Sequence, residues 1–268
     1  MRHRAFAYRT AQGAGTPIIS SASEKIILAL DFGHLNEALD LARSMAGLVG
    51  MFKINIHLFT SEGPEAVRKI GALGPGIFLD LKYHDIPNTV AGAVAVAAEL
   101  PKVRLLDLHT TGSEAMMRAG AQALAHRGSG RPKLLGITIL TSLGHSDLRR
   151  VGIGGTPGSR ALSLARLAKR CGLDGVVASP KEVRQIRRAC GRDFLIVVPG
   201  IRPKAGESKR QDDQARVATP TEAIRGGADY LVVGRPITAA ADPPRAAREI
   251  AEEIAAALPI SLGHVVTV

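Results

Sequence analysis

The chain has 268 residues, 46% of them hydrophobic and 22% charged, which favours a folded globular protein over a disordered one. Even the apolar stretch Val90–Ala98 is shorter than the roughly 18 residues of a membrane span, so no membrane protein is predicted. The net charge of +11 favours anionic ligands, while an aromatic content of 3% and scattered basic residues argue against nucleic acid. The two cysteines, Cys171 and Cys190, are too few for a disulfide framework and favour the cytoplasm.

The N-terminal segment, residues 1–23, carries three arginines and no acidic residue. This composition is shared by transit peptides and by solvated basic tails, and it lacks the apolar region of a secretory signal. We expect a disordered basic tail, because nothing in the segment could bury itself. The folded catalytic domain is then expected to span residues 24–268.

From Lys25 onward, short apolar runs alternate with longer segments of helical period, the pattern of repeated βα units and a parallel sheet. Eight runs predict strands, at Ile26–Leu30, Met51–Ile54, Ile77–Leu81, Val103–Leu108, Leu134–Leu140, Gly175–Ala178, Phe194–Val198 and Tyr230–Val233. The predicted helices are Asn36–Ala46, Pro64–Leu73, Asn88–Leu100, Ser113–Ala125, Ser159–Cys171, Pro180–Cys190, Thr221–Gly226 and Pro244–Leu258. Eight parallel units without a dividing linker favour a single (β/α)8 TIM barrel over an open doubly wound sheet, which usually has about five or six strands.

Polar residues follow nearly every predicted strand. They are Asp31, Lys53, Asp80 with Lys82, His109, Thr141 with Ser142, Ser179, Pro199 with Gly200, and Gly234 with Arg235. In a TIM barrel the loops after the strands form the C-terminal mouth, where active sites lie. A solvated loop residue or a helix cap is the simpler interpretation of any single one, but their occurrence together predicts a site.

Residues 78–89, with the sequence FLDLKYHDIPNT, carry the most informative charge pattern. Asp80 and Lys82 are two apart on a strand, so their side chains point to the same face. If that face is the barrel interior, a carboxylate and an ammonium lie side by side, with Lys53 on the neighbouring strand and Asp85 just beyond. For an isolated pair, a stabilising ion-pair network is as good an interpretation as catalysis. Four alternating charges at the mouth favour a catalytic site.

Two segments have the composition of a phosphate site. Residues 198–202 (VPGIR) follow the seventh strand and residues 233–235 (VGR) the eighth, where barrels commonly bind phosphate on backbone N–H groups and a helix N-terminus. Glycine lets the backbone approach, and Arg202 and Arg235 add bidentate donors. The stretch 203–216 is longer than usual barrel loops, which predicts a mobile lid over this site.

The segment 80–89 closely resembles the signature of the orotidine 5'-phosphate decarboxylase family, whose members make UMP from orotidine 5'-monophosphate. The resemblance extends from Ile26 to about Pro244 and includes 29–31 (ALD), 52–53 (FK), 140–142 (LTS), 171–177 (CGLDGVV), 199–202 (PGIR), 216–220 (RVATP) and 233–238 (VGRPIT). The central motif is specific, whereas the Gly-Arg motif is shared with other phosphate-binding barrels. The resemblance implies a carboxy-lyase of pyrimidine biosynthesis, a TIM-barrel homodimer that catalyses the last step of UMP synthesis without metal or organic cofactor.

By position, the resemblance also implies the site residues. The catalytic network would be Lys53, Asp80, Lys82 and Asp85, with Asp85 and Thr89 reaching into the partner's site. Asp31 would bind the ribose and Thr141, with Ser142, the pyrimidine. The phosphate would be bound by Arg202, Gln214, Gly234 and Arg235, where Gln214 is preferred to Gln211 because its spacing to Arg216 fits the family better.

Two positions depart from the family pattern. Asn55 stands where many members have Gly, and residues 107–111 (DLHTT) differ from the usual small-residue version. Neither is expected to touch the charged network, so we expect them to affect local packing only.

The implied reaction removes CO2 from C6 of the pyrimidine, where the carbanion has no ordinary electron sink. Lys82, held by Asp80 and Asp85, is expected to stabilise that charge and then deliver the proton. One alternative is a keto-sugar phosphate decarboxylase of the same superfamily that uses Mg²⁺ at similar Asp and Lys positions. Residues 86–89 (IPNT) and Arg202 favour the nucleotide enzyme. An alternative of a different class is a basic nucleic-acid-binding barrel, suggested by the net charge of +11 and the arginine-rich tail.

Overall fold

The computed structural model describes residues 21–203 and 216–259. All but the last three residues of the predicted N-terminal tail lie outside the described residues. The predicted lid falls largely on residues 204–215, which also lie outside them, together with Gln211 and Gln214. No helix within the described ranges is long and apolar enough to cross a membrane.

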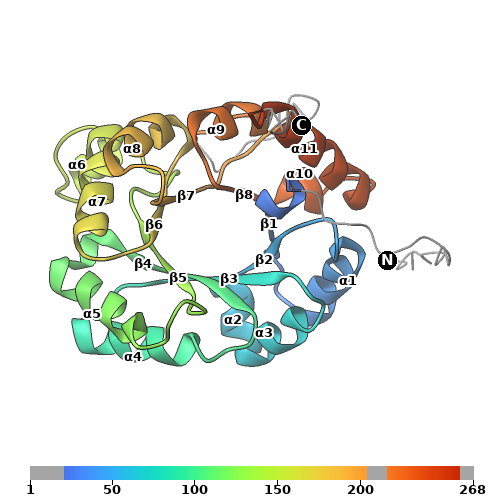
Figure 1. The fold of residues 1–268 in the computed structure, drawn as a ribbon, viewed down its shortest axis with the longest axis horizontal. Helices are drawn as coiled ribbons and strands as arrows, with labels where there is room; N and C mark the ends of the chain where they lie inside the picture. The colour runs from blue at the N-terminus through green and yellow to red at the C-terminus, as the bar shows by residue number, and fades with distance from the viewer. Residues whose placement is uncertain (1–20, 204–215, 260–268) are drawn as a thin grey trace, which may run out of the picture.

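Eight parallel strands close into a barrel in sequence order, with β8 pairing with β1, which confirms the predicted (β/α)8 fold. Figure 1 shows the strands as an inner ring and the helices as an outer one. The strands are β1 (Ile26–Ala29), β2 (Met51–Asn55), β3 (Gly76–Tyr83), β4 (Val103–His109), β5 (Lys133–Ile137), β6 (Gly175–Val177), β7 (Leu195–Val198) and β8 (Tyr230–Val233). Each lies within a few residues of its predicted run.

The predicted helices all form, within a few residues of their expected ends. They are α1 (Leu35–Met45), α3 (Pro64–Gly71), α4 (Pro87–Ala97), α5 (Glu114–Ala125), α7 (Pro157–Arg170), α8 (Val183–Cys190), α9 (Pro220–Gly226) and α11 (Pro243–Ala257). The start of the predicted helix Pro180–Cys190 is instead a 3-10 turn, η3 (Pro180–Glu182); η1 (Ser23–Lys25) and η2 (Thr110–Gly112) are further 3-10 turns.

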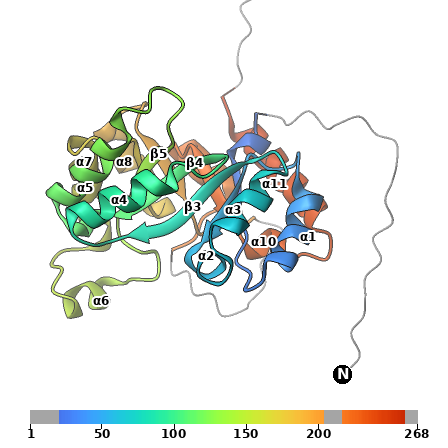
Figure 2. The same ribbon diagram turned by 90° about the horizontal axis from the view of Figure 1, so that it is seen from below.

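Three short helices were not predicted, and all directly follow strands or their loops. They are α2 (Ile56–Glu62), α6 (His145–Arg150) and α10 (Arg235–Thr238). Figure 2 shows α6 on a loop that projects from one end of the barrel. These helices belong to the βα loops, so they help to shape the barrel mouth.

Alternate residues of each strand face opposite sides of the barrel wall. One side packs against the helices in the main core, which includes Leu28, Phe52 and Leu106. The other side fills the barrel interior with a smaller apolar cluster, formed by Ile27, Ala29, Met51, Phe78, Leu105, Leu135, Val197 and Val232. Further along the same strands, towards their C-terminal ends, the interior positions become charged.

Candidate active site

A cavity of about 360 Å³ opens at the C-terminal ends of the strands. It is lined by Ala29, Asp31, Lys53, Phe78, Asp80, Lys82, Ile137, Ile139, Leu140, Thr141, Ser142, Val177, Ala178, Pro199, Gly200, Arg202, Val232, Gly234 and Arg235. Every strand except β4 and β7 contributes to this lining, and Pro199 and Gly200 directly follow β7. The cavity therefore joins segments from one end of the chain to the other, as sites at barrel mouths do.

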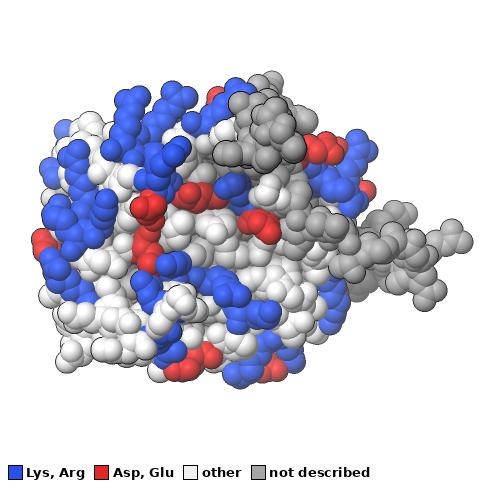
Figure 3. Space-filling model, in the orientation of Figure 1, with Lys and Arg blue, Asp and Glu red and all other residues white. Residues whose placement is uncertain are grey.

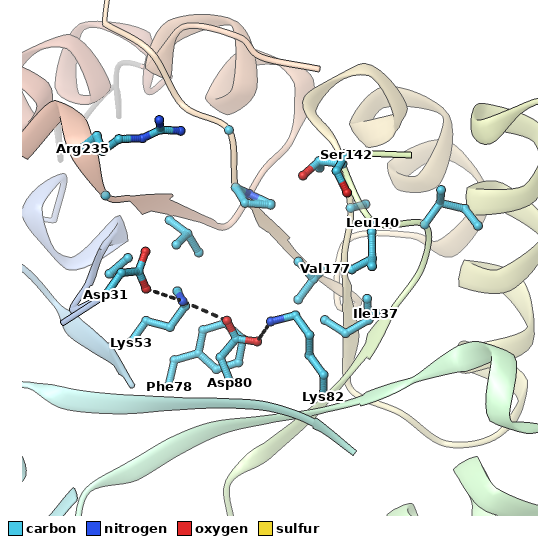
Figure 4. A pocket seen from close by; sticks show the side chains of 18 of the residues that line it. Asp31, Lys53, Phe78, Asp80, Lys82, Ile137, Leu140, Ser142, Val177 and Arg235 are labelled. Atoms are coloured by element: carbon cyan, nitrogen blue, oxygen red, sulfur yellow. Dashed lines mark hydrogen bonds and ion pairs between the residues drawn. The ribbon is translucent and has the colours of Figure 1, made fainter. Parts of the chain in front are cut away.

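Four alternating charges run along one wall of the cavity, from β1 across β2 to β3 (Figure 4). The Nζ atom of Lys53 lies 3.3 Å from Asp31 Oδ1 and 2.9 Å from Asp80 Oδ2. The other oxygen of Asp80, Oδ1, pairs with Nζ of Lys82. The structure thus brings together three of the four predicted catalytic residues, and it adds Asp31 to the same row.

The ionisation of the row follows from its geometry. Burial alone would lower the pKa of Lys53, but the carboxylates of Asp80 and Asp31 outweigh it and raise that pKa. Burial alone would raise the pKa of Asp80, but the ammonium groups of Lys53 and Lys82 hold it well below its usual value. A lysine is charged below its pKa and a carboxyl above its own, so both groups are ionised throughout the neutral range.

Lys82 is the member of the row that can meet a ligand. The side chains of Lys53 and Asp80 are 11% and 8% exposed, whereas that of Lys82 is 33% exposed. Figure 4 shows its ammonium group at the end of the row, facing the open part of the cavity. The buried pair Lys53–Asp80 thus positions the accessible ammonium group of Lys82. Both members of that pair are charged, and burial holds them in place.

The structure corrects the expectation that Asn55 and Asp107 do not touch the charged network. Asn55 Nδ2 donates to Asp31 Oδ1 at 2.9 Å, and Asn55 Oδ1 caps α2 by accepting from Leu58 N at 3.0 Å. Asp107 Oδ1 accepts from the backbone N–H of Lys82 at 2.8 Å. Both residues face the barrel interior at the level of the row, which is why they contact it.

Three of the predicted phosphate residues, Arg202, Gly234 and Arg235, line the cavity. Arg235 is the first residue of α10 and follows Gly234, and Figure 4 shows its side chain extending over the cavity above Asp31 and Lys53. Arg202 also lines the cavity, two residues after Gly200, whose φ of +75° favours glycine. Two arginines and two glycines at the ends of β7 and β8 provide the donors and backbone access that a phosphate needs.

A buried ion pair fastens the loops on this side. Arg216 Nη1 lies 2.6 Å from Glu182 Oε1, and its Nη2 donates to the carbonyl oxygens of Ile139 at 3.3 Å and Leu140 at 3.0 Å. The bonds hold the chain after residue 215 against the loop that follows β5. That loop carries Thr141 and Ser142. Arg216 therefore holds in place both the chain that follows residue 215 and the loop that carries these two cavity residues.

Thr141 and Ser142, which the sequence predicts to contact the pyrimidine, line the cavity. The lining also includes apolar side chains that sequence reasoning did not assign to the site, among them Phe78, Ile137 and Val177. These residues were assigned only to strands, although their interior orientation follows from strand alternation with Asp80 as the reference. Together the polar and apolar groups form a wall against which a planar ring can lie.

Two predicted site residues are not in the cavity of their own chain. Asp85 is exposed, and its Oδ1 accepts from the backbone N–H of Ile86 at 2.6 Å. Thr89 is exposed in the first turn of α4. Neither lines the cavity. Ile86, between them, is a large apolar residue with 67% of its surface exposed.

A second hollow lies outside the barrel, between α7 and α8. It is lined by Arg166, Lys181, Arg184, Arg188, Leu162, Gln185 and Ala189, and Figure 3 shows Lys and Arg side chains gathered over these helices. Among the residues that the structure describes, no acidic one lines this hollow, whereas Asp31 and Asp80 line the cavity at the barrel mouth. In residues 21–203 and 216–259, no three His, Cys, Asp or Glu side chains are grouped so that they could hold a metal ion.

Comparisons with known proteins place these features in one family. A family model described as orotidine 5'-phosphate decarboxylase / HUMPS family matches residues 24–250. The chain is 50% identical over 238 residues to orotidine 5'-phosphate decarboxylase of Geobacter sp. (strain M21), covering 88% of this chain and 98% of that protein. It is 51% identical over 239 residues to the enzyme of that name from Pelobacter propionicus, covering 89% and 98%.

A solved structure agrees. The crystal structure of orotidine 5'-phosphate decarboxylase from Lactobacillus acidophilus superimposes with a TM-score of 0.74 and 36% sequence identity. The match covers 85% of this chain and 98% of that one.

Proposed function

The chain belongs to the orotidine 5'-phosphate decarboxylase / HUMPS family, and we propose that it converts orotidine 5'-monophosphate to UMP at the row of charges along its barrel mouth. The observation that carries the mechanism is the row Asp31–Lys53–Asp80–Lys82, joined by ion pairs and ending in an accessible ammonium group. A cation held in place beside the reacting carbon is what a reaction through an unstabilised carbanion requires.

The cavity orients the substrate by its two ends. The phosphate binds between Arg202 and Arg235, with backbone donors near Gly234, while Gln214 is a further candidate ligand outside the described residues. The ribose hydroxyls meet Asp31, whose exposed carboxylate lies between the phosphate side and Lys53. The pyrimidine then extends towards Thr141 and Ser142, and its C6 comes to Lys82. Binding energy from the remote phosphate thereby fixes the reacting carbon beside its acid.

In the chemical step, the bond between C6 and the carboxylate carbon breaks and CO2 leaves. The electron pair of that bond remains on C6, beside the Lys82 ammonium. The Nζ–H of Lys82 then delivers a proton to C6, which completes UMP, and Lys82 regains a proton from solvent. Because Asp80 and Lys53 are already ionised and fixed by burial, little reorganisation is needed as the charge develops.

We also propose that the active site is completed in a homodimer. Asp85 and Thr89 are exposed and do not line the cavity of their own chain, and exposed Ile86 lies between them. A second copy packed on this apolar surface would bury Ile86 and receive Asp85 and Thr89 at its own mouth. The reaction is proposed to take place in the cytoplasm, whose reducing conditions suit the two free, buried cysteines.

The reaction is expected to proceed without a metal ion, because the proposed charge stabilisation uses only side chains. Purified protein should consume orotidine 5'-monophosphate, followed by its loss of absorbance, at the same rate with and without a chelator. A rate that falls with chelator and returns with Mg²⁺ would instead support the keto-sugar phosphate alternative. Supplying a keto-sugar phosphate in a parallel assay separates the two directly.

Replacing Arg235 by alanine is expected to weaken UMP binding by one to two decades. A charge-assisted hydrogen bond of about 1.5 to 3 kcal/mol would be lost, which converts to that change in dissociation constant. Calorimetric titration with UMP measures it, and Arg245→Ala is the matched control, since that arginine is exposed on α11 and pairs with Glu249. Unchanged UMP affinity in the Arg235 variant would remove this residue from the phosphate site.

A further inference from the structure

Asp107 is a fully buried carboxyl group that the proposed reaction does not use. It lies near the end of β4 with 0% of its surface exposed. Leu105, two residues earlier, belongs to the apolar cluster inside the barrel, so Asp107 faces the same interior. An acidic side chain is costly to bury without partners, and its position beside the charged row calls for an explanation.

The pairing between β3 and β4 is irregular opposite Asp107. Leu79 pairs with Leu106 and Tyr83 with Leu108. Three residues of β3, numbers 80 to 82, therefore face the single residue Asp107 on β4. Extra residues in one strand form a β-bulge, which interrupts the ladder of backbone hydrogen bonds and redirects side chains.

Lys82 takes the strained position in this bulge. Its φ is +52°, in the left-handed region that is unfavourable for a residue other than glycine. Its backbone N–H does not continue the ladder but donates to Asp107 Oδ1 at 2.8 Å. The side chain of Asp107 thus takes the place of the strand carbonyl that the bulge displaces.

The backbone conformation at residue 82 determines where the lysine side chain starts. In a regular strand, the side chains of residues 80 and 82 would rise in parallel from the same face. In the bulge, the ammonium group of Lys82 instead turns onto Asp80 Oδ1, at the end of the row. A contact that stabilises this form of the bulge therefore also fixes the direction of the Lys82 ammonium group, the proposed proton donor.

We propose that Asp107 is a positioning residue: by accepting the Lys82 N–H, it keeps Lys82 in the left-handed conformation that directs its ammonium group to Asp80 and to C6 of the substrate. This inference rests on the proposed function of Lys82 as the acid. What it adds is a requirement for a hydrogen-bond acceptor at position 107, not for a negative charge.

The surroundings of Asp107 favour a neutral acceptor. Burial and the neighbouring Asp80 carboxylate raise the pKa of Asp107 well above its usual value. A side-chain hydrogen bond to Asp80 further favours the protonated form of Asp107. A neutral acid still accepts through one oxygen, so an amide of the same shape should serve as well.

The test compares two replacements of nearly equal shape. Asp107→Asn keeps an oxygen for the Lys82 N–H and is expected to retain kcat within about threefold. Asp107→Leu fills the same space without an acceptor and should lower kcat about tenfold to a hundredfold, the range expected when a catalytic group is misplaced by about an ångström. UMP affinity should stay within about threefold in both variants, because neither change touches the phosphate or ribose contacts.

Leu106→Ala controls for lost stability. Leu106 is fully buried on the opposite face of the same strand, in the outer core; its truncation should lower the melting temperature and leave kcat unchanged below it. If Asp107→Leu does not fold, Asp107→Ala takes its place in the comparison. A crystal structure of the leucine or alanine variant should show Lys82 outside the left-handed region, a readout that needs no activity.

Three results would overturn the inference. They are wild-type kcat in the variant without an acceptor, an equal loss in the asparagine and leucine variants, or an unmoved Lys82 backbone. Failure of the proposed function is distinguishable from all three, because it would appear as an inactive wild-type protein, whereas the positioning of Lys82 would still be tested by the variant structures.

Discussion

Lys82→Ala is expected to lower the turnover of orotidine 5'-monophosphate by at least about three orders of magnitude. General acid catalysis alone contributes about 10²- to 10⁴-fold, and the same ammonium group also stabilises the carbanion before the proton moves. The phosphate and ribose contacts do not involve Lys82, so the variant should still bind UMP. Turnover is followed by substrate absorbance and UMP binding by calorimetry.

Lys102→Ala is a matched control for this change. Lys102 is exposed just before β4 and also has a left-handed backbone, with φ of +62°, so the two substitutions have similar local conformational effects. Only the one at position 82 removes a charge from the cavity. Turnover near the wild-type rate in the Lys82 variant would show that another group protonates C6.

The fold was predictable because a parallel barrel repeats one simple pattern. Each strand is a short apolar run buried on both faces, and each helix between them has its own apolar stripe. The short helices of the loops were not predicted. In α2 and α6, only Leu58 and Leu148 respectively are buried, so no periodic apolar stripe marks either helix in the sequence.

The sequence predicts which residues form most of the site, but it does not predict how their side chains are arranged. Alternation correctly put Asp80 and Lys82 on one face, yet it implied a regular strand, and the bulge at residues 80–82 is set by pairing with β4. The left-handed conformation of Lys82 has no local sequence signal, because it is stabilised by the hydrogen bond that its N–H donates to Asp107, 25 residues away. The contacts of Asn55 with Asp31 and of Asp107 with Lys82 likewise join residues far apart in the sequence. The sequence alone therefore predicts only packing roles for Asn55 and Asp107.

For the predicted strand Leu134–Leu140, the apolar pattern of the sequence overestimates the length of the strand. Its apolar residues continue to Leu140, but β5 ends at Ile137. The carbonyl oxygens of Ile139 and Leu140 bond to Arg216, which is more than 70 residues further along the chain. A contact from another loop ends the strand, so hydrophobic pattern alone overestimates its length.

Mixing Lys82→Ala and Asp85→Asn chains is expected to restore activity that neither variant has alone. If Asp85 serves the partner's site, a mixed dimer has one site with both lesions and one with neither. Unfolding the two variants together and refolding them makes about half of the dimers mixed, and each has one intact site of two. Activity should therefore approach about a quarter of the wild-type value.

The decisive control for a shared site pairs Lys82→Ala with Asp80→Asn. Lys82 and Asp80 lie on the same strand and pair within one barrel, so a mixed dimer of these chains has a lesion in both sites and should stay inactive. Native mass spectrometry establishes that mixed dimers form in both experiments. Mixed dimers of the Lys82 and Asp85 variants without activity would mean that Asp85 serves its own chain. Recovery there and none in the control pair would place the exposed carboxylate of Asp85 beside Lys82 of the neighbouring subunit, where it completes the alternating row of charges.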